Sequence, residues 1–372
     1  MKILFIFGTR PEAIKLAPLI EEFSKYKNKF QIKICVTAQH REMLDQVLTF
    51  FQIHADYDLN LMRTNQSLPD VTGRCLKKLD EVVADFTPDL IIVQGDTLST
   101  FLGALVGYFR KIKIAHIEAG LRSGDKYSPF PEEINRILTS HIADFHFAPT
   151  EKARKNLFKE GIRKNIFVVG NTVIDALLKG ITIINKGDQK IYEKYFSSID
   201  LTGKIILVTA HRRESFGKPF ENICNAIKEI AVKNPEVNIV FPVHLNPNVR
   251  KPVHEILSGL ANVHLLEPLD YPHLIWLMNK SYLILTDSGG IQEEAPSLNK
   301  PVLVMRYKTE RKEGIKSNTA ILVGTSKKKI VDSTNKLLRD AGLYLSMSKS
   351  SNPYGDGQTS KRIVEYFLGK SE

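Results

Sequence analysis

The sequence predicts an α/β protein made of two doubly wound parallel sheets. Along its 372 residues, short runs that are apolar throughout and rich in β-branched residues alternate with longer segments of helical period. Such runs are typical of strands that helices cover on both faces of a parallel sheet. A chain of this length also exceeds the size at which one hydrophobic core keeps growing, so we expect two domains.

Twelve runs have the length and composition of buried strands, six in each half of the chain. The strands expected in the first half span residues 2–7, 31–37, 89–95, 113–117, 145–149 and 166–170. Those expected in the second half span residues 204–210, 237–243, 263–268, 282–287, 301–305 and 320–324.

The domain boundary is expected between Asn171 and Thr202, where a helical segment gives way to a polar segment with little periodicity. We therefore predict one domain over residues 1–171 and a second over residues 172–356. The segment 357–372 has the pattern of an amphipathic helix that can pack on either domain, and we assign it to the first. With two such domains, the cleft between them is the expected ligand site.

Composition and charge exclude several classes of protein. The apolar fraction of 43% suits packed cores, and no stretch approaches the roughly 20 apolar residues that span a bilayer. The start MKILFIFGTRPE reads as a first strand rather than a secretion signal, and three scattered cysteines fit a reducing cytoplasm. The net charge of +11 suits a lysine-rich surface, a diphosphate ligand or nucleic acid. Because basic residues are not clustered with aromatics, we do not expect nucleic-acid binding.

The segment FGTRPEAIK predicts a helix start at the end of the first strand. Thr9 and Glu12 have the spacing of a capping box, and the free amides of such a helix start attract anions. Arg10 and Lys15 would add positive charge, although an ordinary capped helix with exposed basic residues explains the pattern equally well. No G-x-G-x-x-G follows this or any other expected strand, so a dinucleotide cofactor is not expected.

Three carboxylates occupy positions where parallel strands should end. Asp96 follows DLIIVQG, Glu118 follows KIAHI, and Glu132 lies in the loop SPFPEE. Ligands bind at the carboxyl ends of strands in open α/β sheets, so these residues are candidates for acid/base chemistry. Considered singly, each is as readily a helix cap or an ion-paired structural residue.

The second half carries a candidate phosphate site after the run YLILTD. Ser288 can cap the following helix, while Gly289 and Gly290 leave the backbone amides open to a phosphate. Glu294 can accept hydrogen bonds from ribose hydroxyls. The alternative is a helix cap beside a solvated glutamate.

Basic residues after other strands add donors for an anion. They are His211 and Arg213 in TAHRRE, and Arg306 and Arg311 in RYKTERKEG. Arginine suits bidentate contacts with phosphate. None of the ten histidines stands in an H-x-x-x-H or similar metal-binding pair, so no catalytic metal is expected.

Together these motifs closely resemble the non-hydrolysing UDP-N-acetylglucosamine 2-epimerases, from Met1 to the C-terminal segment. The strings that carry the resemblance are GTRPEAIKLAPL, VTAQHREMLDQV, QGDTLSTFLGAL, HIEAGLRSGDKYSPFPEEINR, GNTVIDAL, TAHRRE, PVHLNP, LILTDSGGIQEEAPSLNKPVLVMR and NPYGDGQTSKRIV. The resemblance implies a GT-B architecture, with two Rossmann-like domains around a deep cleft. It also implies interconversion of UDP-GlcNAc and UDP-ManNAc without NAD or metal, in a cytoplasmic homodimer that supplies UDP-ManNAc for cell-surface polysaccharides.

The same resemblance implies roles for individual residues. The implied catalytic residues are Asp96, Glu118, Glu132 and His211. The implied substrate contacts are Arg10, Lys15, Asp96, Glu118, His211, Leu274, Ser288, Gly289, Gly290, Glu294 and Arg311, with Leu274 packed against the uracil. Gln39, His40 and Arg213 would contribute to a second, regulatory UDP-GlcNAc site.

Elimination is the route that the chemistry of this reaction favours. The hydrogen on C2 is not acidic, because C2 bears an amide nitrogen rather than a carbonyl. Loss of H2 together with UDP from C1 gives 2-acetamidoglucal, and return of UDP with protonation on the opposite face inverts C2. The route requires proton-transfer groups on two faces and cations beside the diphosphate. Which carboxylate removes H2 stays open.

Some positions depart from the family pattern. Gln94 stands where His is common, and Tyr307, Lys308 and Lys312 replace residues that are usually Asp, Thr and Pro.

Four other functions remain open. They are an epimerase for a modified sugar such as a 2,3-diacetamido uronic acid, a hydrolysing relative that releases ManNAc, a GT-B glycosyltransferase and a catalytically silent sensor.

Overall fold

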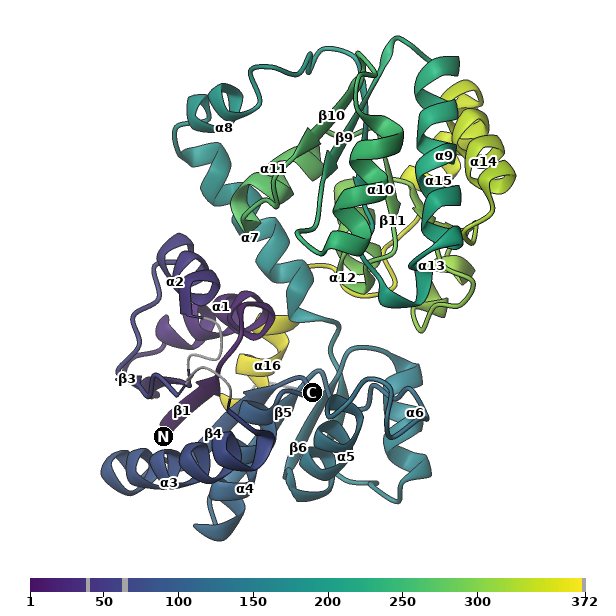
Figure 1. The fold of residues 1–372 in the computed structure, drawn as a ribbon. Coiled ribbons are helices and arrows are strands. Elements are labelled where there is room, and N and C mark those ends of the chain that lie inside the picture. The colour runs from purple at the N-terminus through teal and green to yellow at the C-terminus, as the bar shows by residue number, and fades with distance from the viewer. Residues whose placement is uncertain (38–40, 62–65, 370–372) are drawn as a thin grey trace. The chain divides into compact units, whose positions relative to one another are not determined.

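The chain forms two compact units, which Figure 1 draws as a ribbon. The computed structural model describes residues 1–37, 41–61 and 66–369. The first unit comprises Met1–Ala176 with Gly355–Glu372, and the second comprises Leu177–Tyr354. The chain passes from the first unit to the second inside helix α7 (Thr172–Lys186).

The first unit is built, within its described residues, on a seven-stranded sheet in the order β3-β2-β1-β4-β5-β6-β7. The strands are β1 (Lys2–Phe7), β2 (Gln31–Val36), β3 (Tyr57–Asp58), β4 (Leu90–Gln94), β5 (Lys113–Ile117), β6 (Phe145–Ala148) and β7 (Ile166–Val168). Each pairs in parallel with its neighbours. The six strands expected from the sequence are confirmed. The sequence does not predict β3, because its two residues form no apolar run and pair only with the end of β2.

Helices flank this sheet, and the C-terminal helix is one of them (Figure 1). The helices are α1 (Arg10–Ser24), α2 (Arg41–Phe50), α3 (Leu68–Phe86), α4 (Leu98–Phe109), α5 (Glu132–Ile142), α6 (Glu151–Lys159), the first part of α7, and α16 (Thr359–Phe367). The ring of Phe367 in α16 lies 5.9 Å from Phe23 in α1 and 5.5 Å from Phe145 in β6. Tyr366 lies 4.4 Å from Phe167 in β7. These aromatic contacts fix α16 on the first unit.

The second unit repeats the design with a six-stranded parallel sheet in the order β10-β9-β8-β11-β12-β13. The strands are β8 (Lys204–Thr209), β9 (Val237–Pro242), β10 (Val263–Leu266), β11 (Leu283–Thr286), β12 (Val302–Val304) and β13 (Ala320–Leu322). The helices are α8 (Lys190–Tyr195), α9 (Lys218–Lys233), α10 (Pro247–Leu257), α11 (Tyr271–Lys280), α12 (Gly289–Glu294), α13 (Lys312–Lys316), α14 (Lys327–Arg339) and α15 (Ala341–Ser348). All six strands expected in this half are confirmed.

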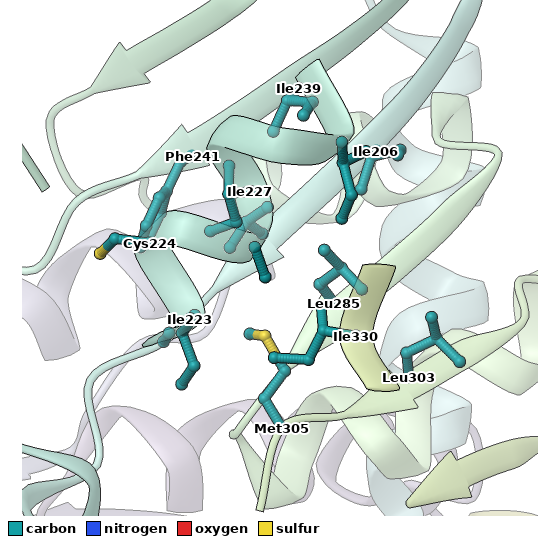
Figure 2. Close-up of a cluster of buried hydrophobic side chains, with 14 of the residues drawn as sticks. Ile206, Ile223, Cys224, Ile227, Ile239, Phe241, Leu285, Leu303, Met305 and Ile330 are labelled. Atoms are coloured by element: carbon teal, nitrogen blue, oxygen red, sulfur yellow. The ribbon is translucent and has the colours of Figure 1, made fainter. Parts of the chain in front are cut away.

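The core of the second unit shows why these runs become buried strands. Figure 2 shows Ile223 and Ile227 of α9 facing side chains from β8, β9 and β11, such as Ile206, Phe241 and Leu285. All five are completely buried. Each such side chain contributes about 1.5–3 kcal/mol when it leaves water. The predicted class, α/β with doubly wound parallel sheets, is confirmed, and no helix in the described ranges is long and apolar enough to cross a bilayer.

The strand orders define one topological switch point in each unit. In the first unit, the chain runs outward in opposite directions from β1 and β4, so the switch point lies between these strands. In the second unit it lies between β8 and β11. Ligands of doubly wound sheets bind beyond the carboxyl ends of the strands at such points. The two switch points therefore locate the segments in which functional side chains are expected.

Candidate active site

Glu12 joins the two loops at the switch point of the first unit. Its carboxylate accepts hydrogen bonds from the backbone N–H of Gly8 (3.0 Å) and Thr9 (2.8 Å), and the capping box expected at Thr9 is present. It also accepts from the hydroxyls of Thr97 (2.7 Å), the N-cap residue of α4, and Thr100 (3.0 Å), in the first turn of that helix. Burial raises the pKa of Glu12, and these hydrogen bonds oppose that shift. Glu12 therefore fixes the turn after β1 to the turn after β4.

Glu118 follows β5 and is held by two donors on the same oxygen. Lys15 Nζ lies 2.5 Å from Oε2, and the amide of Gln94 donates to that oxygen as well. The Glu118 side chain is 5% exposed, so the ion pair is largely shielded from water. Its backbone φ of 65° lies in the left-handed region, where a residue with a Cβ is strained by roughly 1–3 kcal/mol. The strain and the two donors together fix the direction of this carboxylate.

Asp96, beyond β4, is bound to helix α5. Its Oδ2 forms an ion pair with Arg136, and its backbone carbonyl accepts a hydrogen bond from Asn135 Nδ2 at 3.1 Å. Arg136 also contacts Glu133, with 3.1 Å between Nη1 and Oε2. The start of α5 therefore lies beside the first switch point, which the linear sequence does not reveal.

Glu132 is the first residue of α5, so its predicted place in a loop is wrong by one residue. One of its carboxylate oxygens, Oε2, is buried and has no hydrogen-bond partner among the described residues. The neighbouring Glu133 is 1% exposed and accepts hydrogen bonds from the backbone N–H groups of Ser123 and Gly124. The two adjacent glutamates thus differ: Glu133 is saturated with partners, while Glu132 retains an acceptor.

Asp287 organises the switch point of the second unit. It is completely buried, and its Oδ2 accepts hydrogen bonds from the backbone N–H of His211 (2.7 Å) and Arg212 (2.8 Å). His211 Nδ1 lies 3.6 Å from Oδ1, and its ring stacks on His244 with centroids 5.3 Å apart. Burial lowers the pKa of His211, partly offset by Asp287, which favours a neutral ring that donates one N–H.

The Ser-Gly-Gly turn and Arg311 come together in the same unit. Ser288 is the N-cap residue of α12, but its side chain makes no capping hydrogen bond, so the predicted cap is only partly right. A Cβ on Gly289 would lie 2.9 Å from Cζ of Arg311. The guanidinium therefore lies directly against the turn, held by Glu293 (2.9 Å) and Glu310 (2.5 Å). A backbone turn with an adjacent guanidinium is a suitable anion site.

Glu294 ends α12 in a nearly enclosed position. It is 8% exposed, and the hydroxyl of Tyr271 lies 3.5 Å from its Oε2. Burial raises the pKa of Tyr271 well above its ordinary value, and the nearby carboxylate adds to that shift. A Cβ on Gly290 would lie 3.4 Å from Glu294 Oε1. Leu274 is partly exposed on α11, one turn after Tyr271.

The remaining sequence-predicted residues are dispersed. Arg10 is the partly exposed first residue of α1, and Arg213 is exposed in a short 3₁₀ helix spanning Arg213–Ser215. Gln39 and His40 lie outside the described residues. Across residues 1–37, 41–61 and 66–369, no group of three or more His, Cys, Asp or Glu side chains could hold a metal ion.

Sequence reasoning missed Asp287, and it assigned Glu12 only a local role. Asp287 is the last residue of an expected strand, and a carboxylate at the end of an apolar run is a usable signal. Its partners come from residues far away in sequence, so their identity needs the sheet order. Arg136 could not be identified from the sequence for the same reason, because it pairs with Asp96 from 40 positions further along the chain.

Comparison with known proteins decides the family. A family model described as UDP-N-acetylglucosamine 2-epimerase matches residues 23–368. The chain belongs to this family. The UDP-N-acetylglucosamine 2-epimerase of Yersinia pestis is 54% identical over 368 residues, covering 98% of each chain, and that of Escherichia coli K12 is 53% identical over the same length and coverage.

Solved structures of UDP-N-acetylglucosamine 2-epimerases share the fold. The UDP-GlcNAc 2-epimerase of Neisseria meningitidis bound to UDP-GlcNAc is 50% identical, with a TM-score of 0.91 over 99% of this chain and 100% of that one. The Methanocaldococcus jannaschii enzyme in complex with UDP-GlcNAc and UDP is 36% identical, with a TM-score of 0.82 over 99% and 100%. The GT-B class expected from the resemblance is thereby confirmed.

Proposed function

We propose that this chain catalyses the reversible C2 epimerisation of UDP-GlcNAc to UDP-ManNAc. The observation that carries the proposal is the match of more than half the residues, over nearly the whole chain, to UDP-N-acetylglucosamine 2-epimerases. The positions of the candidate residues support it. Carboxylates lie beyond β4 and β5 in the first unit, and anion donors lie beyond β8 and β11 in the second.

The proposed reaction proceeds by anti elimination and re-addition of UDP, without hydrolysis. A carboxylate removes H2 as the C1–O bond to UDP breaks, which leaves 2-acetamidoglucal. UDP then re-forms the bond to C1 while C2 receives a proton on the opposite face. Asp96, Glu118 and Glu132 are the proposed proton-transfer groups. Asp96 and Glu118 each have a cationic partner, whereas Glu132 has an acceptor oxygen to offer to substrate.

The proposed UDP site belongs to the second unit. The turn of Ser288, Gly289 and Gly290 would bind the diphosphate through backbone N–H groups, together with Arg311. His211 would donate to the departing diphosphate as a neutral ring, and Glu294 would accept from the ribose. Leu274 would pack against the uracil.

The first unit would supply Arg10 and Lys15 to the same ligand. Lys15 would bind the phosphate while it keeps its ion pair with Glu118. Gln39, His40 and Arg213 are proposed for a second, regulatory UDP-GlcNAc site. We infer that the protein acts as a cytoplasmic homodimer without cofactor, and that the product feeds the synthesis of cell-surface polysaccharide.

Product analysis tests the proposal. Purified protein is incubated with UDP-GlcNAc and no added cofactor, and the mixture is separated by ion-exchange chromatography and identified by NMR. We expect UDP-ManNAc to appear and to reach the same equilibrium ratio from either sugar nucleotide. Release of free ManNAc and UDP would instead indicate a hydrolysing enzyme. No conversion of UDP-GlcNAc, with turnover of a 2,3-diacetamido uronic acid derivative, would indicate the modified-sugar alternative.

Gly289→Ala is expected to weaken UDP binding by about 10- to 100-fold. The new methyl would lie 3.2 Å from Nε and 2.9 Å from Cζ of Arg311, so the guanidinium must shift away from the turn. Isothermal titration with UDP measures the effect. Gly73→Ala, where a Cβ meets nothing within 4 Å, is the control and should bind UDP like the wild type. An unchanged dissociation constant for Gly289→Ala would argue against this turn as the phosphate site.

A further inference from the structure

We infer that Glu133, which lies outside the proposed catalytic set, is a positioning residue that acts through Arg136 to orient the Asp96 carboxylate. The inference rests on the proposed function, because it assigns Asp96 a task in proton transfer. It concerns three side chains of the first unit, two on α5 and one beyond β4.

Glu133 is a buried charge whose acceptor capacity is fully used. It is 1% exposed. Its Oε1 accepts from the backbone N–H groups of Ser123 (2.9 Å) and Gly124 (3.0 Å), and its Oε2 accepts from Ser123 (3.0 Å). Oε2 also lies 3.1 Å from Nη1 of Arg136, one turn further along the helix. A buried carboxylate with this set of partners has little freedom to rotate.

Arg136 transfers this rigidity to Asp96. Its side chain is 13% exposed, and its two terminal nitrogens are divided between two carboxylates. Nη1 contacts Glu133, while Nη2 donates to Asp96 Oδ2. Because the guanidinium is planar and rigid, fixing Nη1 also fixes the direction in which Nη2 points. The ion pair with Asp96 therefore has a defined geometry only while Glu133 holds the other end.

The backbone of Asp96 is held by the same helix. Asn135 Nδ2 donates to the Asp96 carbonyl at 3.1 Å, so α5 contacts both the main chain and the side chain of this residue. Glu133 in turn anchors the start of the loop that leads to Glu132 through Ser123 and Gly124. One buried carboxylate thus couples the placement of Asp96 to that of the loop before Glu132.

A second glutamate–arginine pair in the same unit provides a matched control. Glu160 accepts from Nε and Nη2 of Arg122, both at 2.6 Å, and the Arg122 side chain is 9% exposed. This pair has the same chemistry and comparable burial of the arginine, and none of the hydrogen bonds that Arg122 makes among the described residues goes to Asp96. Glu160→Gln therefore removes an ion pair of the same kind without disturbing the Asp96 carboxylate.

The test is Glu133→Gln, with kcat, KM and the thermal unfolding midpoint measured for UDP-GlcNAc epimerisation. Gln keeps the volume but is neutral and has only one acceptor oxygen. With that oxygen on the N–H groups of Ser123 and Gly124, its NH2 group faces the guanidinium of Arg136, so Asp96 loses its orientation. Misplacement of a catalytic group typically costs up to about 100-fold, and we expect kcat to fall about 10- to 100-fold with KM nearly unchanged. Glu133→Asp should restore part of the rate. Glu160→Gln should lose thermal stability but keep its kcat.

A double-mutant cycle with Asp96→Asn separates positioning from a purely structural role. If Glu133 acts through Asp96, adding Glu133→Gln to Asp96→Asn should change the residual rate by less than about twofold. If the rate losses of the two single variants instead multiply in the double variant, the inference is overturned. A Glu133→Gln enzyme with wild-type kcat would overturn it as well. A wild-type protein without epimerase activity would contradict the proposed function itself. An active wild type with an unaffected Glu133→Gln variant would contradict this inference alone.

Discussion

Replacing Glu118 with Gln is expected to lower the rate of epimerisation by about 1,000-fold while leaving UDP affinity nearly unchanged. A positioned proton-transfer group typically contributes about 10²- to 10⁴-fold, and the expected loss lies near the middle of that range. Gln keeps the shape of the side chain and can still accept a hydrogen bond from Lys15, but it cannot take up a proton from carbon. The strained backbone at this residue, with φ of 65°, supports a functional rather than a structural role.

The measurement is the initial rate of UDP-ManNAc formation, with UDP binding followed in parallel by titration calorimetry. Glu81→Gln is the matched control, because Glu81 pairs with Lys78 at 2.7 Å on the exposed surface of α3. This surface pair should contribute at most about 1 kcal/mol to stability and nothing to turnover. A Glu118→Gln enzyme within tenfold of the wild-type rate would exclude Glu118 from proton transfer.

Acidification from pH 7 to pH 5 is expected to destabilise the first unit by about 4 kcal/mol through two buried histidines. His116 in β5 and His146 in β6 are paired in register and are 0% and 2% exposed. Burial lowers the pKa of His116 from 6.5 to about 3, with a partly offsetting hydrogen bond from the ring to the Gly95 carbonyl. Burial likewise lowers the pKa of His146 from 6.5 to about 4.

Acid lowers the stability because the unfolded state binds protons on these two rings more readily than the folded state does. Between pH 6.5 and the lowered pKa values, the unfolded chain protonates these rings while the folded chain does not. Their contribution is therefore complete above pH 6.5 and is lost as the pH falls toward about 4 and 3. Each ring contributes a slope of about 1.4 kcal/mol per pH unit in that window, or about 2 kcal/mol between pH 7 and pH 5.

Urea unfolding at several pH values measures this effect. Far-UV circular dichroism follows both units, whereas fluorescence of the single tryptophan, Trp276, reports on the second unit. With both His116 and His146 replaced by Gln, the pH slope of the circular-dichroism transition should flatten and the fluorescence transition should not change. The exposed His254 is the control for a surface replacement. An unaltered slope in the double variant would contradict this account of acid sensitivity.

The strands could be predicted because each is a local pattern. The four central residues of β8, IILV, are apolar at every position, and only a sheet covered on both faces buries such a run completely. β3 has no such pattern, since Tyr57 and Asp58 become a strand only by pairing with the end of β2. Because β3 forms only through this tertiary contact, a local sequence pattern cannot predict it.

The candidate site could be predicted only in part, for the same reason. Asp96 and Glu118 are recognisable because they lie within two residues of the ends of β4 and β5. Their partners Arg136 and Lys15 lie 40 and 103 positions away, on helices whose packing sets the contact. Nothing local distinguishes Glu133, which is saturated with hydrogen bonds, from Glu132, which keeps a buried acceptor.

Solvent isotope incorporation tests the central claim most directly. The wild-type protein is incubated with UDP-GlcNAc in deuterium oxide, and C2 of the product is examined by proton NMR and mass spectrometry. Because the proton removed from one face is replaced from exchangeable groups on the other, each UDP-ManNAc formed should carry one deuterium at C2. UDP-ManNAc formed with its original hydrogen still on C2 would contradict elimination and re-addition and would require a different route of inversion.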